Sequence, residues 1–223
     1  MRLVYVTWRG KPLYDRLLIK SIKSARRWLD KDEVYVIAIG GYRGDFDATV
    51  IQADPVPIHD WIANRLAICD IMDDEMLYLD ADIIVNRDIR ELFDGDFEFR
   101  ARVAYDDPRC GGQHLARIAA SLGKPATPMW NGGAVIFKKG LHRRIKKEWY
   151  DLYQAFVTRK LPTPPGCAYH WVQLSFALAV AGHKVLPLSS EEHYLYGVDG
   201  RDLERPYLIH FVRHKEVMLR MEL

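Results

Sequence analysis

The stretch Glu75–Val85 reads EMLYLDADIIV and carries two carboxylates inside an otherwise apolar run. Its hydrophobic residues predict one buried strand over the whole range. Residues i and i+2 of a strand point to the same side, so Asp80 and Asp82 are expected to converge on one ion. Adjacent carboxylates repel each other and are rarely buried without a partner, so the pair indicates a bound cation. Oxygen ligands favour hard ions such as Mn²⁺ or Mg²⁺.

The Asp-x-Asp spacing is by itself a weak signal, because it recurs elsewhere in the chain. The other pairs lie in polar, turn-like contexts and are interpreted as solvated loop or capping residues: Asp30/Asp32, Asp45/Asp47 and Asp94/Asp96. A strand-end turn with solvated acids is the alternative for Asp80 and Asp82. Their apolar surroundings favour the metal site.

Strands and helices alternate on the N-terminal side of the acidic pair. The apolar runs Leu3–Thr7, Glu33–Ile39 and Ala48–Gln52 predict strands. Helical spacing of apolar residues predicts helices over Tyr14–Leu29 and His59–Met72. This alternation predicts an α/β fold with a mainly parallel central sheet flanked by helices. Ligands of such sheets collect at the carboxyl ends of the strands, where the acidic pair would lie.

The second half of the chain is less regular. Its expected strands lie near Val103–Tyr105, Ala134–Phe137, Val185–Leu186 and Tyr207–Phe211, and its expected helices near Leu141–Arg159 and Trp171–Ala181. Gly- and Pro-rich stretches separate these elements, with no internal repeat and no interdomain linker. We therefore expect one domain over residues 1–223.

Composition narrows the class of protein. Lys and Arg total 32 against 30 acidic residues, so the net charge of +2 gives no support to a nucleic-acid partner. Cys69, Cys110 and Cys167 form no CxxC pair and indicate neither a zinc site nor a disulfide framework. A reducing, cytoplasmic location is therefore expected. No apolar run approaches the length of a transmembrane segment, and the N-terminus has no secretory signal pattern.

The segment around the acidic pair resembles a known enzyme family. Arg65-Leu66, the stretch Glu75–Val85, Asp88-Ile89 and Glu91-Leu92-Phe93 together resemble glycosyltransferase family 8, the glycogenin and galactosyltransferase-like group with the GT-A fold. That family has an Arg-Leu on a helix, a strand ending in Tyr-Leu-Asp-x-Asp, and a short helix closing in Leu-Phe. Two weaker blocks agree with it: Trp130–Phe137 (WNGGAVIF), and Tyr207–Phe211 (YLIHF) followed by Lys215.

The resemblance implies a function and a ligand set. It implies transfer of a sugar from a nucleotide diphosphate sugar, with UDP expected, to a hydroxyl of a glycan, protein or lipid. Asp80, Asp82 and His210 are implied as ligands of Mn²⁺ (or Mg²⁺), with Asp80 also near the ribose. Residues 1–93 would form the nucleotide-binding half, and residues 94–223 the half that completes the metal site and takes the acceptor. A satisfied core histidine is the alternative for His210.

Further residues are expected to contact the donor. Arg65 would approach its sugar or diphosphate, and Lys215 would offer a charge to the diphosphate. Their alternatives are a surface arginine on an amphipathic helix and a solvated basic turn. Thr7, Trp8 and Tyr14 would meet the nucleotide base, although Trp8 fits a core position equally. Asn131, Gly132 and Gly133 could bring backbone close to a ligand or adopt a positive φ, or form an ordinary strand-entry turn.

Gln173 and Asp107 are the candidates for the β-face position of a retaining reaction. An amide is a poor nucleophile, so a front-face departure without a covalent intermediate is expected. Asp106 and Asp107 could instead bind sugar hydroxyls or simply end a strand before Pro108.

The chain departs from the family pattern in several places. The acid that usually precedes the late-helix glutamine is replaced by Val172, and Lys215 is followed by Glu216 instead of Pro-Trp. The chain is also shorter than typical members. A nucleotidyltransferase is one alternative, but only Gly10 follows the first strand where that class has a Gly-rich loop. A non-catalytic nucleotide-sugar-binding protein is the other.

Overall fold

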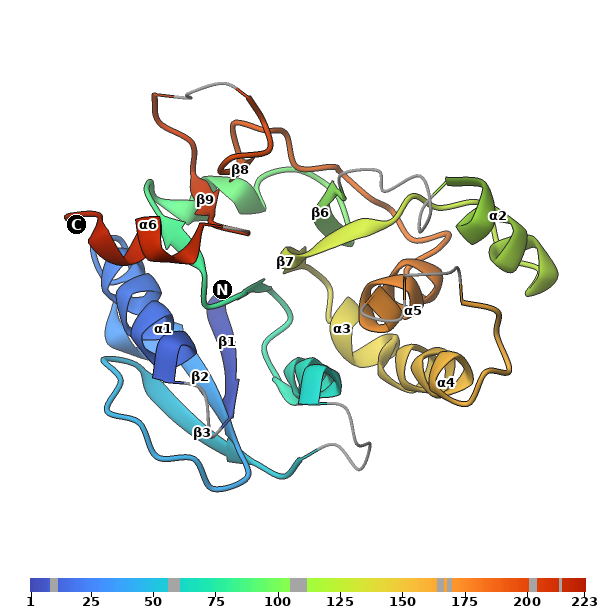
Figure 1. The fold of residues 1–223 in the computed structure, drawn as a ribbon, viewed down its shortest axis with the longest axis horizontal. Helices are drawn as coiled ribbons and strands as arrows, with labels where there is room; N and C mark the ends of the chain where they lie inside the picture. Colours follow the sequence, from blue (N-terminus) through green and yellow to red (C-terminus); the bar gives the residue numbers. More distant parts are fainter. Residues whose placement is uncertain are drawn as a thin grey trace.

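The computed structural model describes residues 1–8, 12–55, 61–104, 112–163, 167, 170–200, 204–212 and 214–223, without the side chains of residues 61 and 62. Its centre is a six-stranded sheet in the order β3-β2-β1-β4-β7-β6 (Figure 1). The strands of this sheet are β1 (Arg2–Trp8), β2 (Val34–Ile39), β3 (Thr49–Ala53), β4 (Met76–Leu79), β6 (Phe99–Val103) and β7 (Trp130–Phe137). β1 to β4 are parallel, while β7 runs antiparallel to both β4 and β6. The expected mainly parallel α/β sheet is confirmed.

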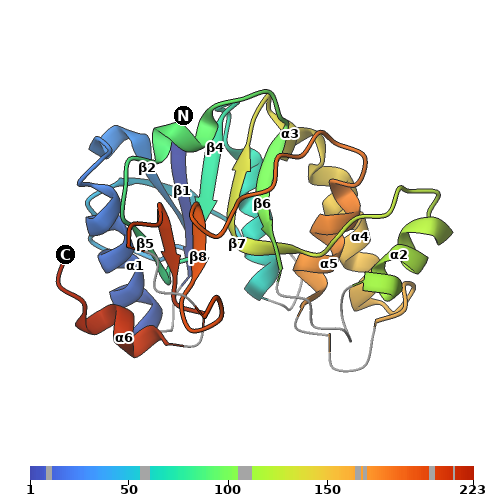
Figure 2. The same ribbon diagram turned by 90° about the horizontal axis from the view of Figure 1, so that it is seen from above.

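Both faces of the sheet are buried, as the continuous apolar strands predict. In β1, Val4 and Val6 belong to one hydrophobic core and Leu3 and Tyr5 to the other. Figure 2 shows α1 (Pro12–Ala25) on one side of the sheet, and α2 (Gly112–Ser121), α4 (Lys146–Val157) and α5 (Trp171–Ala179) on the opposite side. The alternation of side chains in each strand therefore builds two cores and fixes which way each strand end faces.

The strand predicted over residues 75–85 is in fact two strands in two sheets. β4 ends at Leu79, and β5 (Ile83–Val85) belongs to a three-stranded sheet with β8 (His193–Leu195) and β9 (Leu208–His210). Between them the backbone N–H of Asp80 donates to Gly133 (2.7 Å), and the carbonyl of Asp82 accepts from Phe211 (2.9 Å). The turn places the apolar residues of β4 in the large sheet and those of β5 in the small one, with Asp80 and Asp82 in the connection between the two sheets.

Other elements also differ from expectation. The helix expected over His59–Met72 is a 3-10 helix, η2 (Trp61–Asp70), and the one over Leu141–Arg159 breaks at Ile145 into α3 (Leu141–Arg144) and α4. The strand expected at Val103–Tyr105 is β6, which ends at Val103, and Tyr105 lies outside the described residues. Val185 makes only an isolated bridge to Phe99. α2, β8 and the C-terminal helix α6 (Lys215–Arg220) were not predicted.

β6 was misplaced because arginines interrupt its apolar pattern (FRARV). Arg100 is buried; its Nη2 lies 2.5 Å from Glu192, and it also donates to the carbonyls of Leu92 and Leu186. Arg102 forms an ion pair with Asp199. A charged side chain can take a buried position when a distant carboxylate pairs with it, and local sequence does not reveal that partner.

The cysteines correct another expectation. Cys167 is disulfide-bonded, and its partner lies outside the described residues. Cys69 is free and buried. The disulfide removes the cysteine argument for a reducing compartment, so a cytoplasmic location stays an expectation. Among the described residues, no helix is long and apolar enough to cross a membrane.

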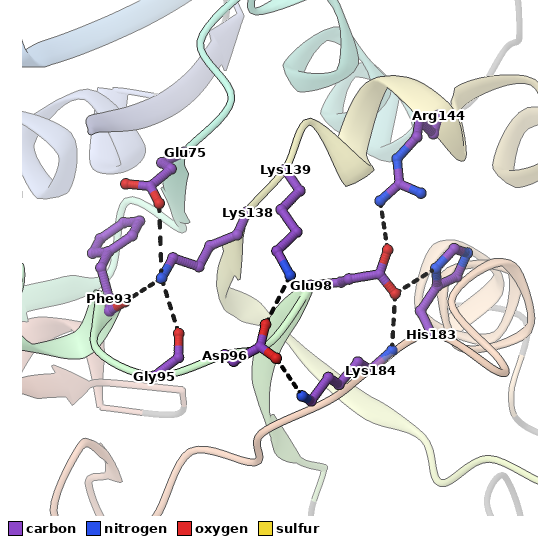
Figure 3. A network of polar contacts seen from close by, with 10 residues as sticks. All are labelled: Glu75, Phe93, Gly95, Asp96, Glu98, Lys138, Lys139, Arg144, His183 and Lys184. Carbon is purple, nitrogen blue, oxygen red and sulfur yellow. Dashed lines mark hydrogen bonds and ion pairs between the residues drawn. The ribbon is translucent and has the colours of Figure 1, made fainter.

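A polar network holds the edge of the large sheet where β7 ends and β6 begins (Figure 3). Lys138 donates to the carbonyls of Phe93 (2.6 Å) and Gly95 (3.1 Å). Asp96 accepts from Lys139 and Lys184, and Glu98 accepts from Arg144, His183 and the backbone N–H of Lys184. The network ties β6, β7, α3 and the loop after α5 together, so it braces the sheet at the end of β7 farther from Gly133.

Glu98 should make stability depend on pH. The hydrogen bond from Arg144 lowers the pKa of Glu98 from 4.5 to about 2, against the opposing effect of burial and with help from Lys184 and His183. The folded carboxylate therefore contributes stability above about pH 4.5, and the contribution is lost as pH falls through about 2. Glu98→Gln should lower the free energy of unfolding at pH 7 by about 1 kcal/mol, a value that allows for solvent screening. Urea unfolding at a series of pH values measures the difference, which should narrow below pH 4.5. Glu222→Gln, at an exposed position, is the control. A difference that is the same at pH 7 and pH 3 would contradict the prediction.

Candidate active site

A pocket of about 270 Å³ lies at the carboxyl ends of β1 and β4. Most residues that the sequence singled out line it: Thr7, Trp8, Tyr14, Arg65, Asp80, Asp82, Gln173 and Lys215. The other lining residues are Val6, Tyr78, Ala81, His170 and Val172. Figure 1 shows α6 beside α1, which is how the C-terminal Lys215 reaches the same pocket as Tyr14. The predicted position at the strand ends is therefore confirmed.

Asp80, Asp82 and His210 come together beside this pocket. One potential ligand atom from each lies within 4.8 Å of the others. Asp80 follows β4, Asp82 precedes β5, and His210 ends β9, which pairs with β5 so that Ile83 lies opposite His210. Asp82 and His210 are each only 5% exposed, and His210 Nε2 lies 3.3 Å from Asp82 Oδ1. The carboxylates converge through a turn between two sheets, and not through the i, i+2 geometry of one strand.

Asp80 is held by two donors. Arg65 Nη2 lies 2.7 and 2.6 Å from its two carboxylate oxygens, and the Tyr78 hydroxyl donates to it at 2.6 Å. Burial is the largest single influence on the pKa of Arg65 and lowers it, but Asp80, Tyr78 and Asp82 together outweigh burial, so the pKa is raised. Burial also raises the pKa of Tyr78. Arg65 thus lines the pocket and is paired with Asp80, so it is not a surface arginine on the outer face of its helix.

Asp82 is held as a carboxylate by contacts with His210 and Lys215. Burial opposes ionisation, but the hydrogen bond and charge of His210, together with Lys215, hold the pKa of Asp82 well below its usual range. Lys215 Nζ lies 2.5 Å from Asp82 Oδ2 and 4.7 Å from the centre of the Tyr14 ring. Burial lowers the pKa of Lys215, but Asp82 and Tyr14 together raise it by more. Lys215 is therefore not part of a solvated basic turn.

The glycines of the WNGGAVIF block lie against the side chains of His210 and Arg65. The backbone N–H of Gly133 donates to Asn131 Oδ1 (2.8 Å). A Cβ on Gly133 would lie 2.4 Å from His210 Cε1, and one on Gly132 would lie 3.0 Å from Arg65 Nη1. Neither glycine has a positive φ. The absence of a side chain lets His210 and Arg65 approach the backbone of β7 closely. Of the two expected reasons for glycine, close approach and a positive φ, the structure therefore supports close approach.

Two histidines of the site escaped the sequence analysis. His170 Nδ1 lies 2.8 Å from Gln173 Oε1, so it holds the carboxamide of the candidate β-face residue. The pattern that could have revealed it is the i, i+3 spacing of His170 and Gln173 at the start of a predicted helix. His193 is fully buried, and its Nε2 lies 3.2 Å from His210 Nδ1. It gave no signal because β8 was not predicted. Asp106 and Asp107 lie outside the described residues.

The family follows from a direct comparison. Residues 63–214 match the model of the family described as glycosyl transferase family 8. The chain belongs to glycosyltransferase family 8. It is accordingly a glycosyltransferase, and the nucleotidyltransferase alternative loses its support. No curated protein gave a significant match.

Solved structures share the fold at low identity. The galactosyltransferase LgtC, in complex with donor and acceptor sugar analogs, has a TM-score of 0.67 and 15% identity over 95% of this chain and 87% of its own. GlyE of Streptococcus pneumoniae TIGR4 has a TM-score of 0.65 and 16% identity, covering 99% of this chain and 61% of its own. The bifunctional glycosyltransferase WbbM has a TM-score of 0.60 and 13% identity, covering 95% of this chain and 45% of its own. These similarities confirm the GT-A fold, and the chain spans less than two thirds of GlyE and less than half of WbbM.

Proposed function

We propose that this family 8 chain is a metal-dependent enzyme that transfers a sugar from a UDP-sugar to a hydroxyl acceptor with retention of configuration. The observation that carries the proposal is the meeting of Asp80, Asp82 and His210 beside a pocket of about 270 Å³. In this proposal residues 1–93 bind the nucleotide, and residues 94–223 complete the metal site and take the acceptor. Asp80 and His210, one from each half, support that division.

The three side chains fit a divalent cation. Their atoms are close enough to share one ion, and the low pKa of Asp82 keeps that ligand ionised. Two carboxylates suit Mg²⁺ and Mn²⁺ alike, and the imidazole nitrogen favours Mn²⁺. A bound ion would act as a Lewis acid toward the donor diphosphate and offset the charge that it gains as it leaves. Asp80, Asp82 and His210 would hold it.

The chain supplies further positive charge to the same place. Arg65 and Lys215 both line the pocket, and each is anchored by one of the site carboxylates. Preorganised cations stabilise the departing diphosphate without reorganising at the moment of reaction. Trp8, at the end of β1, and Tyr14, in α1, offer rings against which a uracil base could stack. Thr7 adds a hydroxyl beside them.

The remaining lining residues favour a reaction without a covalent intermediate. Among the described lining residues the carboxylates are Asp80 and Asp82, both committed to the cation site. Gln173, held by His170, is too weak a nucleophile to replace them. The bond between the anomeric carbon and the diphosphate oxygen breaks first, with its electron pair going to the diphosphate. The acceptor oxygen then attacks from the same face, and its proton passes to the departing phosphate. Glutamine is also the residue that is replaced, by glutamate, in a solved active-site variant of LgtC.

Product analysis tests the proposed function. Incubation with a panel of nucleotide sugars and Mn²⁺ should release nucleoside diphosphate, fastest from one UDP-sugar, and omission of the metal should abolish the release. Glycan, protein and lipid hydroxyls are then offered in turn, and NMR of the product gives the anomeric configuration. Release of pyrophosphate would indicate nucleotidyl transfer, and no product from any donor would indicate a binding protein. Release at the same rate in a metal chelator would contradict the metal dependence.

A further inference from the structure

His193 lies directly behind His210, on the side away from Asp82. β8 runs parallel to β9, and Leu195 lies opposite His210 in the register. The two imidazoles meet through His193 Nε2 and His210 Nδ1, 3.2 Å apart. Their planes differ by 10° and their centroids are 5.4 Å apart. That separation is close to the largest that this nitrogen–nitrogen distance allows, so the rings meet edge to edge in nearly one plane. The contact is a well-directed hydrogen bond and not a face-to-face stack.

The direction of this hydrogen bond follows from what His210 must do. A neutral imidazole has one N–H and one nitrogen with a free lone pair. His210 Nε2 faces Asp82, so a cation shared with Asp82 would take the lone pair of Nε2. The proton of His210 must then lie on Nδ1, where it needs an acceptor. His193 Nε2 is in place to accept it. In metal-binding histidines the N–H of the second ring nitrogen almost always donates a hydrogen bond in this way. That hydrogen bond fixes both the tautomer and the orientation of the ring.

His193 is itself held in position by backbone contacts. Its N–H donates to Ser189 (3.0 Å), and its carbonyl accepts from Arg102 Nη1 (2.6 Å). Arg102 is in turn paired with Asp199, and the backbone N–H of Leu195 donates to the same carboxylate at 2.7 Å. The backbone of β8 at His193 is therefore held by contacts that lie outside the cation site.

The other nitrogen of His193, Nδ1, is buried and makes no hydrogen bond within the described part of the chain. A buried polar atom without a partner costs folding free energy, and an apolar side chain at this position would avoid that cost. The hydrogen bond with His210 therefore explains the polar side chain at position 193, and packing of the core does not.

We propose that His193 is a positioning residue that fixes the ring plane and the tautomer of His210 for binding of the divalent cation. This inference rests on the metal dependence proposed above. His193 does not touch the substrates, and it acts only through His210.

Mn²⁺ titration followed by electron paramagnetic resonance tests this without any assay of transfer. His193→Leu keeps an apolar core but removes the acceptor, and should weaken Mn²⁺ binding by about 10–100-fold. His193→Gln places an amide oxygen near the position of Nε2 and should recover most of the affinity. His142→Leu is the matched control: His142 is also fully buried, has an unpartnered Nδ1, and packs at the other end of β7 against Phe137. That variant should lose stability and keep its Mn²⁺ affinity.

The outcomes separate this inference from the proposed function. Equal Mn²⁺ affinity of wild type and His193→Leu would overturn the positioning role and leave the metal dependence intact. A wild-type chain that binds no Mn²⁺ would overturn both. If the leucine variant does not fold, the comparison of His193→Gln with the shorter His193→Asn decides. Tighter binding by the glutamine variant supports the role, and equal binding by the two overturns it.

Discussion

Replacing Asp82 by Asn is expected to remove the rise in melting temperature that Mn²⁺ and a UDP-sugar together give the wild-type chain. Asp82 is the buried carboxylate of the triad, and its low pKa keeps it ionised at every pH of interest. The amide keeps the shape but loses the charge, and one oxygen lone-pair set is replaced by N–H donors that repel a cation. A ligand at 100 times its dissociation constant stabilises the folded state by about 2.7 kcal/mol. For a chain of this size that corresponds to about 5–10 °C.

The comparison must be made between the ligand-induced shifts of each protein. Asp82→Asn also removes the partner of Lys215, so its melting temperature without ligand is expected to differ from that of the wild type. Asp45→Asn is the matched control, because Asp45 belongs to another Asp-x-Asp pair and is exposed. It should retain the full shift. If Asp82→Asn shows the full ligand-induced rise in melting temperature, Asp82 is not a ligand of the metal ion.

Gly133→Ala is expected to damage the same site through shape alone. The added Cβ would lie 2.4 Å from His210 Cε1 and 2.9 Å from its Nδ1, well inside van der Waals contact. The ring has little room to retreat, because it is buried and His193 lies behind it. Either His210 leaves the triad or β7 shifts away from β4. We expect Mn²⁺ affinity to fall at least about tenfold, and the free energy of unfolding to fall by about 1–3 kcal/mol.

Gly132→Ala is the control for this second prediction. Its Cβ would approach Arg65 Nη1 at 3.0 Å, which is the far end of a flexible side chain that can move by a few tenths of an ångström. Mn²⁺ affinity should therefore stay close to the wild-type value. Calorimetric titration and urea unfolding of both variants measure the two effects. Wild-type affinity and stability in Gly133→Ala would show that β7 and His210 are not packed as described.

Features that depend on neighbouring residues followed from the amino-acid sequence. The apolar periodicity of the first 85 residues determined the α/β class and the alternating elements of the first half. The acidic pair in an apolar run pointed to a cation, and the motif around it pointed to Arg65 and to the family. These features are local, because a strand or helix is recognised from residues within one or two turns of each other.

The meeting of distant residues followed from the packing of the strands and helices. The stretch around Asp80 and Asp82 is a turn between two sheets because Gly133 and Phe211 hold it, and both lie more than 50 residues further along the chain. The same applies to Lys215, which reaches Asp82 only because α6 packs beside α1, and to the buried arginines of β6. His193 needed β8, a strand with no sequence signal of its own. Strand order and sheet pairing bring such groups together, and no local pattern of hydrophobic residues contains that information.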